Sequence, residues 1–140
     1  MLISLQLFVQ GDDLLPQSIT EQLGISPGHA YAMGEKWTTG QGAIRLRPTG
    51  LWKWGISKEH DDPDLTLIVK DFCQAIVHQA GNISEIPGVE RAWIDIFICK
   101  EIAEGESSDV TFNLDSASLK ELSKLNLPME FTTGIVKAEN

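Results

Sequence analysis

The sequence has no lysine or arginine before Lys36 and no long run of apolar residues. A secretory signal needs a basic start followed by an uninterrupted apolar stretch, and a transmembrane helix needs about 18 consecutive apolar residues. Residues 1–13 fit neither pattern, because Ser4 and Gln6 interrupt the apolar positions and Gly11-Asp12-Asp13 ends them. We therefore expect a cytoplasmic protein with no membrane segment.

Motifs for catalysis and cofactor binding are also missing. There is no HExxH, no Gly-x-Ser-x-Gly, and no Gly-Lys-Ser/Thr after the glycines Gly40 and Gly42. The sequence thus offers no zinc-protease site, no serine nucleophile and no phosphate-binding loop. The three histidines, among them His29 and His78, have no partner at metal-ligand spacing. We expect a protein that is not an enzyme and that holds no cofactor or metal.

Two acidic features leave alternatives open. His60 is followed by Asp61, Asp62 and Asp64, which could hold a hard cation, but we favour the acidic start of a helix, where the helix dipole stabilises negative charge. Asp95 lies within an apolar strand, and if buried it could be the acid of an enzyme whose chemistry the sequence hides. We favour a polar-face or edge position for it, since unpaired acids are rarely buried.

Cysteine is scarce, with Cys73 in an apolar helical pattern and Cys99 at the end of an apolar strand. Two such thiols in a cytoplasmic protein usually serve as packing residues. We favour that interpretation over a disulfide between them.

The charge is strongly negative and unevenly spread. The net charge is −9, with 20 acidic and 11 basic residues, which disfavours nucleic acid as a general partner. Residues 36–58 nevertheless contain five basic residues and no acidic one, while acidic residues cluster at 59–64 and 101–109. We expect an electrically polar molecule with one basic face and an acidic remainder.

Apolar residues at every second position predict most of the strands, at residues 3–9, 43–47, 51–57, 91–100, 110–114 and 127–136. Strands 43–47 and 51–57 form a hairpin in this interpretation, joined at Pro48-Thr49-Gly50, because Pro-x-Gly between apolar runs favours a turn. Strand 91–100 is apolar on both sides, which is typical of a central strand.

Apolar residues three and four positions apart predict three helices. The first has Pro16 in its first turn, a capping box at Ser18-Ile19-Thr20-Glu21 and Gly24 as its end. Residues 25–34, rich in glycine and proline, are expected to form a loop.

The second helix is the longest, with Asp62 as its N-cap and Gly81 as its C-cap. The third begins at Asp115 or Ser118. The apolar stripe of the long helix contains Leu65, Ile68, Val69, Phe72, Cys73, Ile76, Val77 and Ala80.

The predicted order is β-α-β-β-α-β followed by β-α-β, within one domain over residues 1–140. The first six elements match the ferredoxin-like arrangement. We therefore expect an α+β fold, with a mainly antiparallel sheet and helices packed on one face.

Several residues in this order point to one family. Leu23-Gly24-Ile25-Ser26-Pro27 follows the first strand and helix, then come Gly34 and the hairpin with Trp52, and Leu119-Lys120-Glu121-Leu122 lies near the end. In these features the chain resembles the bacterial family of domain of unknown function 4279. The resemblance covers nearly the whole chain and implies a compact α+β domain, but no reaction, cofactor or catalytic residue. Small acidic bacterial proteins of this appearance are often similar in role to immunity proteins.

The hairpin region 36–58 combines tryptophans with cations. Such a surface can stack bases and hold phosphates, or it can anchor a protein partner. We place Trp52 in the core, and for the arginines we leave open an anion contact or a solvated strand edge. The alternative function is therefore small-ligand or nucleic-acid binding through Arg45, Arg47, Lys53 and Trp54.

Our main prediction is a non-enzymatic protein-binding domain, and its specific form is an immunity protein that neutralises a basic toxin domain. An acidic surface can mimic the phosphate charge that a nuclease expects. The predicted contact residues are Asp61, Asp62, Asp64, Glu101, Glu104, Glu106 and Asp109.

Overall fold

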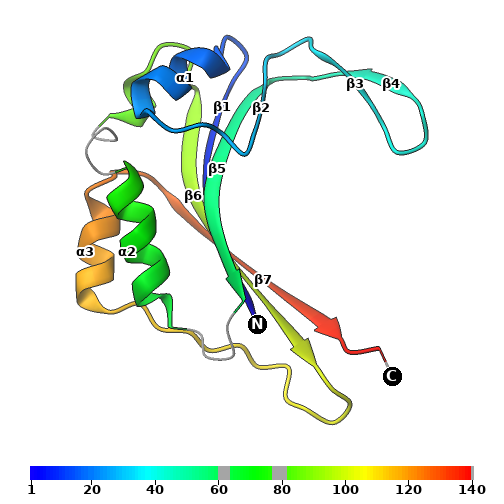
Figure 1. Cartoon of the computed structure of the whole chain (residues 1–140), viewed down its shortest axis with the longest axis vertical. Helices are drawn as coiled ribbons and strands as arrows, with labels where there is room; N and C mark the ends of the chain where they lie inside the picture. Colours follow the sequence, from blue (N-terminus) through cyan, green and yellow to red (C-terminus); the bar gives the residue numbers. More distant parts are fainter. Residues whose placement is uncertain (60–63, 77–81, 140) are drawn as a thin grey trace.

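The structure is a computed structural model that describes residues 1–59, 64–76 and 82–139. It has an α+β fold with a five-stranded, mainly antiparallel sheet and a separate two-stranded sheet. The α-helices of the described chain are α1 (Pro16–Leu23), α2 (Leu65–Ile76) and α3 (Ser116–Ser123). All three lie on one face of the larger sheet, as the sequence predicts (Figure 1).

The strand order confirms the ferredoxin-like first part. β2 (His29–Tyr31), β5 (Gly50–Glu59), β1 (Leu2–Gly11) and β6 (Arg91–Ile102) follow one another across the sheet, each antiparallel to its neighbour. With α1 and α2 they give the β-α-β-β-α-β order. β7 (Met129–Lys137) then lies beside β6 as a parallel edge strand, reached through the crossover helix α3.

The hairpin predicted from residues 43–47 and 51–57 is wrong. β4 (Ile44–Leu46) pairs instead with β3 (Lys36–Thr38) in the two-stranded sheet, while β5 pairs along its whole length with β1. The other side of β5 pairs with β2, which lies in the segment expected to be a loop. In this arrangement β5 pairs with one strand on each side and Trp52 is buried, whereas Ile44 on β4 is 72% exposed.

Residues 110–114 do not form the predicted strand. Their only ladder contact among the described residues is an isolated bridge between Asn113 and Asp64. Phe112 instead stacks on Phe131 of β7, with 6.0 Å between ring centroids. The alternating pattern of this segment therefore reflects aromatic packing against the sheet.

Helix ends agree only in part with the sequence prediction. α1 begins at Pro16 after Leu15, so Ser18 lies inside the helix and the predicted capping box is wrong. Gly24 ends the helix in a left-handed conformation, as expected. Asp115 is the N-cap of α3, since its Oδ1 accepts a hydrogen bond from the Ser118 amide at 2.7 Å. The caps predicted for α2, Asp62 and Gly81, lie outside the described residues.

The core forms between the sheet and the three helices. Every second residue of β1 and β6 points into it, and so do the apolar stripe of α2 and Trp52 of β5. Cys73 is part of this core and Cys99 is half-buried, and both thiols are free, in agreement with the packing interpretation. No helix within the described ranges has the length and apolar character needed to cross a bilayer.

Candidate functional site

Side chains of the larger sheet that point away from the helices form its second face, which we call the uncovered face. Phe8 of β1 is directly opposite Lys53 of β5 and Trp93 of β6, so these three side chains share one row across it. They point outward because strand residues alternate between faces and their neighbours, such as Val9 and Trp52, are buried against the helices.

This row contains an ordered stack of two aromatic rings between two cations. The rings of Phe8 and Trp93 are nearly parallel, with centroids 5.0 Å apart and 4° between planes. The Lys53 ammonium lies 5.4 Å from the centroid of Phe8, and the Arg91 guanidinium carbon lies 4.1 Å from that of Trp93. We call the set Lys53, Phe8, Trp93 and Arg91 the cation–aromatic stack. Cations over ring faces are attracted by the ring quadrupole.

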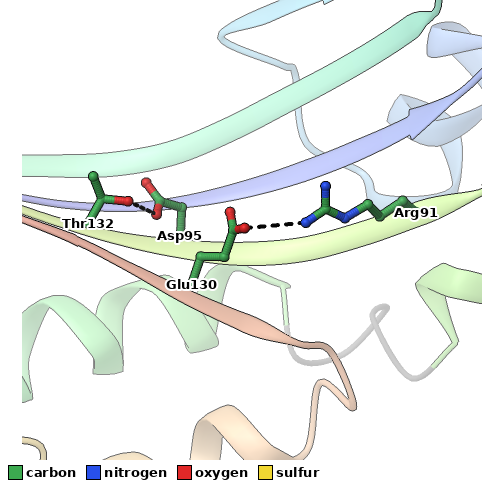
Figure 2. Close-up of polar contacts among 4 residues, drawn as sticks. All are labelled: Arg91, Asp95, Glu130 and Thr132. Carbon is green, nitrogen blue, oxygen red and sulfur yellow. Dashed lines mark hydrogen bonds and ion pairs between the residues drawn. The ribbon is translucent and has the colours of Figure 1, made fainter.

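Polar contacts continue from this stack toward β7 (Figure 2). Arg91 is ion-paired with Glu130 at 3.3 Å, and Thr132 donates a hydrogen bond to Asp95 Oδ1 at 2.9 Å. Asp95 thus lies on the uncovered face and is only half-buried. This position agrees with the polar-face interpretation and differs from the buried environment that a general acid requires.

The two-stranded sheet projects beyond the larger sheet as an arm, formed by β3 and β4 (Figure 1). Arg47, directly after β4, links the arm to β2. Its guanidinium carbon lies 4.0 Å from the ring centroid of Tyr31 on β2 and 4.4 Å from that of Trp37 on β3. Backbone bonds of 2.8 Å, from the Arg47 amide to Glu35 O and from the Gly34 amide to Arg47 O, fix its position. We call Tyr31, Arg47 and Trp37 the Arg47 clamp.

The residues of the alternative anion-binding prediction are only partly brought together. Lys53 belongs to the cation–aromatic stack and Arg47 to the clamp, while Arg45 lies opposite Trp37 on the arm. Trp54 lies on the helix side of the sheet and stacks on Phe72 of α2 at 5.3 Å, so it shares no surface with Lys53.

Trp37 was among the tryptophans noted in residues 36–58, but four other members of these two groups were not predicted from the sequence: Phe8, Tyr31, Arg91 and Trp93. Phe8 and Trp93 had the alternation of ordinary strand residues, and Tyr31 lay in the expected loop. A signal in the sequence was an aromatic residue on the side of each strand opposite its run of aliphatic residues.

The end of β6 and the loop that follows it lie at the end of the sheet away from the arm (Figure 1). Glu101 lies near the end of β6, and Glu104, Glu106 and Asp109 lie in the loop after it. The bridge between Asp64 and Asn113 brings Asp64 to the same region. Asp61, Asp62 and His60 lie outside the described residues. In the described ranges, no group of three or more His, Cys, Asp and Glu side chains is placed to hold a metal ion.

The loop after β6, which contains Glu104, Glu106 and Asp109, also contacts lysine side chains. Lys100 Nζ donates hydrogen bonds to the carbonyl oxygens of Ser107 and Asp109, at 3.2 and 3.3 Å. A depression of about 460 Å³ between the loop and the end of β7 is lined by Glu104, Glu106 and Lys137, among others. Lysines at this end therefore neutralise part of its negative charge.

Comparison with protein families assigns the chain to a family. The family model described as "Domain of unknown function (DUF4279)" matches residues 2–135. The chain belongs to this family. Comparison with curated proteins and with solved structures gives no significant match. The family assignment supports the resemblance seen in the sequence and assigns no activity to this DUF4279 domain.

A second concave feature of the DUF4279 domain is a groove of about 300 Å³ between α2 and α3. Cys73 lies at this groove and is 2% exposed. Burial raises the pKa of the Cys73 thiol from 9.0 to about 11, with the Glu121 carboxylate adding to the rise and Lys124 opposing it. Such a thiol is a packing residue, because the reactive form of cysteine is the thiolate.

At pH 8, iodoacetamide is expected to label Cys99 well before Cys73. A pKa of about 11 leaves roughly one thiol in a thousand ionised at this pH. Labelling at each site is followed by mass spectrometry of the folded protein. Equal rates at the two cysteines would contradict the prediction.

The raised pKa of the Cys73 thiol predicts that the free energy of unfolding depends on pH. The folded pKa lies above the unfolded value, so the neutral Cys73 thiol contributes its full stability below about pH 9 and loses it as the pH rises toward 11. Between about pH 9 and pH 11, the free energy of unfolding of Cys73→Ala should therefore fall less than that of the wild type.

Proposed function

We propose that the chain is a non-enzymatic protein-binding domain that contacts an acidic segment of its partner through the uncovered face. The cation–aromatic stack carries this proposal, because it places a tryptophan and an arginine on a face opposite the three helices. Tryptophan and arginine contribute most of the binding energy at many protein interfaces. Paired strands also hold these side chains in place, which reduces the entropy lost on binding.

Nucleic acid fits the uncovered face less well. A base stacks on an open aromatic ring face, but Phe8 lies between Lys53 and Trp93, and Trp93 lies between Phe8 and Arg91. The net charge of −9 also repels the dense phosphate charge of a nucleic acid more strongly than it repels a short segment with a few carboxylates. A protein segment with a few carboxylates can instead contact the cations and the ring edges.

Trp93→Ala is expected to weaken binding of the protein partner by at least about 30-fold, because truncating a central interface residue costs about 2 kcal/mol or more. The tagged chain is used to capture the partner from cells that encode it, and the purified pair is measured by calorimetry. Arg91→Ala, at an exposed position, is a second variant that leaves the core intact and should also weaken binding.

Leu67→Ala is the matched control, because Leu67 lies on α2 with 61% of its surface exposed on the helix side. It should bind the partner as the wild type does. If Trp93→Ala and Leu67→Ala gave the same affinity, the contact surface would lie elsewhere.

A second candidate is an immunity protein that neutralises a basic toxin domain through the acidic end. The Asp64–Asn113 bridge favours it, since this bridge brings Asp64 to the segment that follows Glu104, Glu106 and Asp109 in the sequence. A complex of this kind should weaken steeply with salt. The triple variant Glu104→Gln, Glu106→Gln, Asp109→Asn should then abolish capture while Trp93→Ala retains it, which is the reverse of the first candidate's pattern.

A further inference from the structure

The Arg47 guanidinium has an environment unlike that of the other arginines. It lies between the rings of Tyr31 and Trp37, and the two rings restrict its motion. Tyr31 is in turn in edge contact with the His29 ring, with 5.3 Å between centroids. The side chain is therefore already ordered before any ligand arrives.

This ordered cation has no anionic partner within the part of the chain that the structure describes. The ion pairs there join Lys58 to Asp71, Arg91 to Glu130 and Lys124 to Glu121, and no hydrogen bond from the Arg47 side chain is present. Glu35, one of the two acidic residues nearest to Arg47 along the chain, instead accepts a hydrogen bond from the backbone amide of Ala32. A half-buried guanidinium in this state has five N–H donors to satisfy.

We propose that the Arg47 clamp is a carboxylate-binding site for an acidic side chain or chain terminus of the partner. This inference rests on the proposed function, because it specifies the partner chemistry at one end of the uncovered face. A guanidinium presents a planar fork of donors that matches a carboxylate through two parallel hydrogen bonds. The two rings cover the faces of the Arg47 guanidinium and leave the N–H groups along its edge available. Because the rings already restrict the side chain, less entropy is lost on binding.

Arg45 provides the matched comparison. It lies on the same arm, carries the same charge, and pairs across the strands with Trp37, but no ring of the described residues lies over its guanidinium. If binding depended only on positive charge, the two arginines would contribute alike. If it depends on the ordered guanidinium, Arg47 contributes far more.

The experiment is a titration of the full chain, followed by NMR of backbone amides and arginine Nε–H groups. The probes are a hexaglutamate peptide with blocked ends, a hexaglutamine peptide of the same length, and inorganic phosphate. The hexaglutamate peptide should shift the Arg47 and Trp37 signals, and hexaglutamine should not. Arg47→Ala should weaken hexaglutamate binding about tenfold, and Arg45→Ala by less than about threefold.

Arg47→Lys should behave like Arg47→Ala, since lysine keeps the charge and loses the planar fork. Equal losses in Arg45→Ala and Arg47→Ala, or no binding of hexaglutamate to the wild type, would overturn the site. Tighter binding of phosphate than of the peptide would overturn its assignment to carboxylate. None of these titrations uses the cellular partner, so failure here is distinct from failure of the Trp93→Ala capture experiment.

Discussion

Trp52→Ala should lower the free energy of unfolding by about 3–5 kcal/mol, the range for truncating a large buried aromatic side chain. Trp52 is 0% exposed and lies on β5, opposite Val9 of β1 and Ala30 of β2. Its indole Nε1 donates a hydrogen bond to Thr20 Oγ1 at 3.1 Å. The substitution therefore opens a cavity beneath α1 and removes a hydrogen bond between this helix and the sheet.

Urea unfolding monitored by circular dichroism measures this loss. Trp37→Ala is the matched control, because Trp37 lies on the arm with 36% of its surface exposed and outside the core. It should cost less than about 1 kcal/mol. Trp52→Phe should fall between the two, since it keeps most of the apolar volume but loses the hydrogen bond and part of the buried ring. A loss below about 1 kcal/mol for Trp52→Ala would show that the core repacks around the missing ring.

The sequence alone predicted which residues of most elements are buried, because periodicity depends on local geometry. The stripe of α2 is the clearest example, since all its described members from Leu65 to Ile76 are in the core. β1 and β6 likewise bury the predicted alternate residues. These patterns follow from the regular spacing at which side chains return to the same face of a helix or of a strand.

Strand pairing could not be predicted in the same way. Residues 43–47 and 51–57 have the apolar alternation and the proline–glycine turn of a hairpin, but alternation specifies a face and leaves the neighbouring strand open. β5 is ten residues long and matches β1 along its full length, so the longer pairing prevails over the local turn. This outcome leaves β4 to pair with β3.

The candidate site depends on that pairing. Phe8 and Trp93 are far apart in the sequence and meet only because β1 and β6 are neighbours in one register. Arg47 and Lys53 were found from their charge, since basic residues are rare in this acidic chain. Tyr31, one of the two rings that order Arg47, was missed because β2 was expected to be a loop.

Gly55→Ala should destabilise the domain by about 3 kcal/mol or more, the upper end of the range for overpacking. Gly55 lies opposite Gln6 in the middle of the β1–β5 pair. An added Cβ would lie 2.1 Å from the carbonyl oxygen of Leu5 and 2.5 Å from Cδ of Gln6. The side chain of Gln6 can turn away, but the Leu5 carbonyl is part of the central strand, so β5 must move.

Gly40→Ala separates this steric effect from the general effect of replacing a glycine. An added Cβ at Gly40 meets no atom of the described residues within 4 Å, so the free energy of unfolding of Gly40→Ala should stay within about 0.5 kcal/mol of the wild-type value. Urea unfolding measures both variants, and equal stabilities would contradict the close approach of β5 to β1. Because β5 also carries Lys53, a folded fraction of Gly55→Ala should have a displaced cation–aromatic stack. Partner binding should then fall in Gly55→Ala and stay unchanged in Gly40→Ala, which connects the spacing of two central strands to the surface that we propose for recognition.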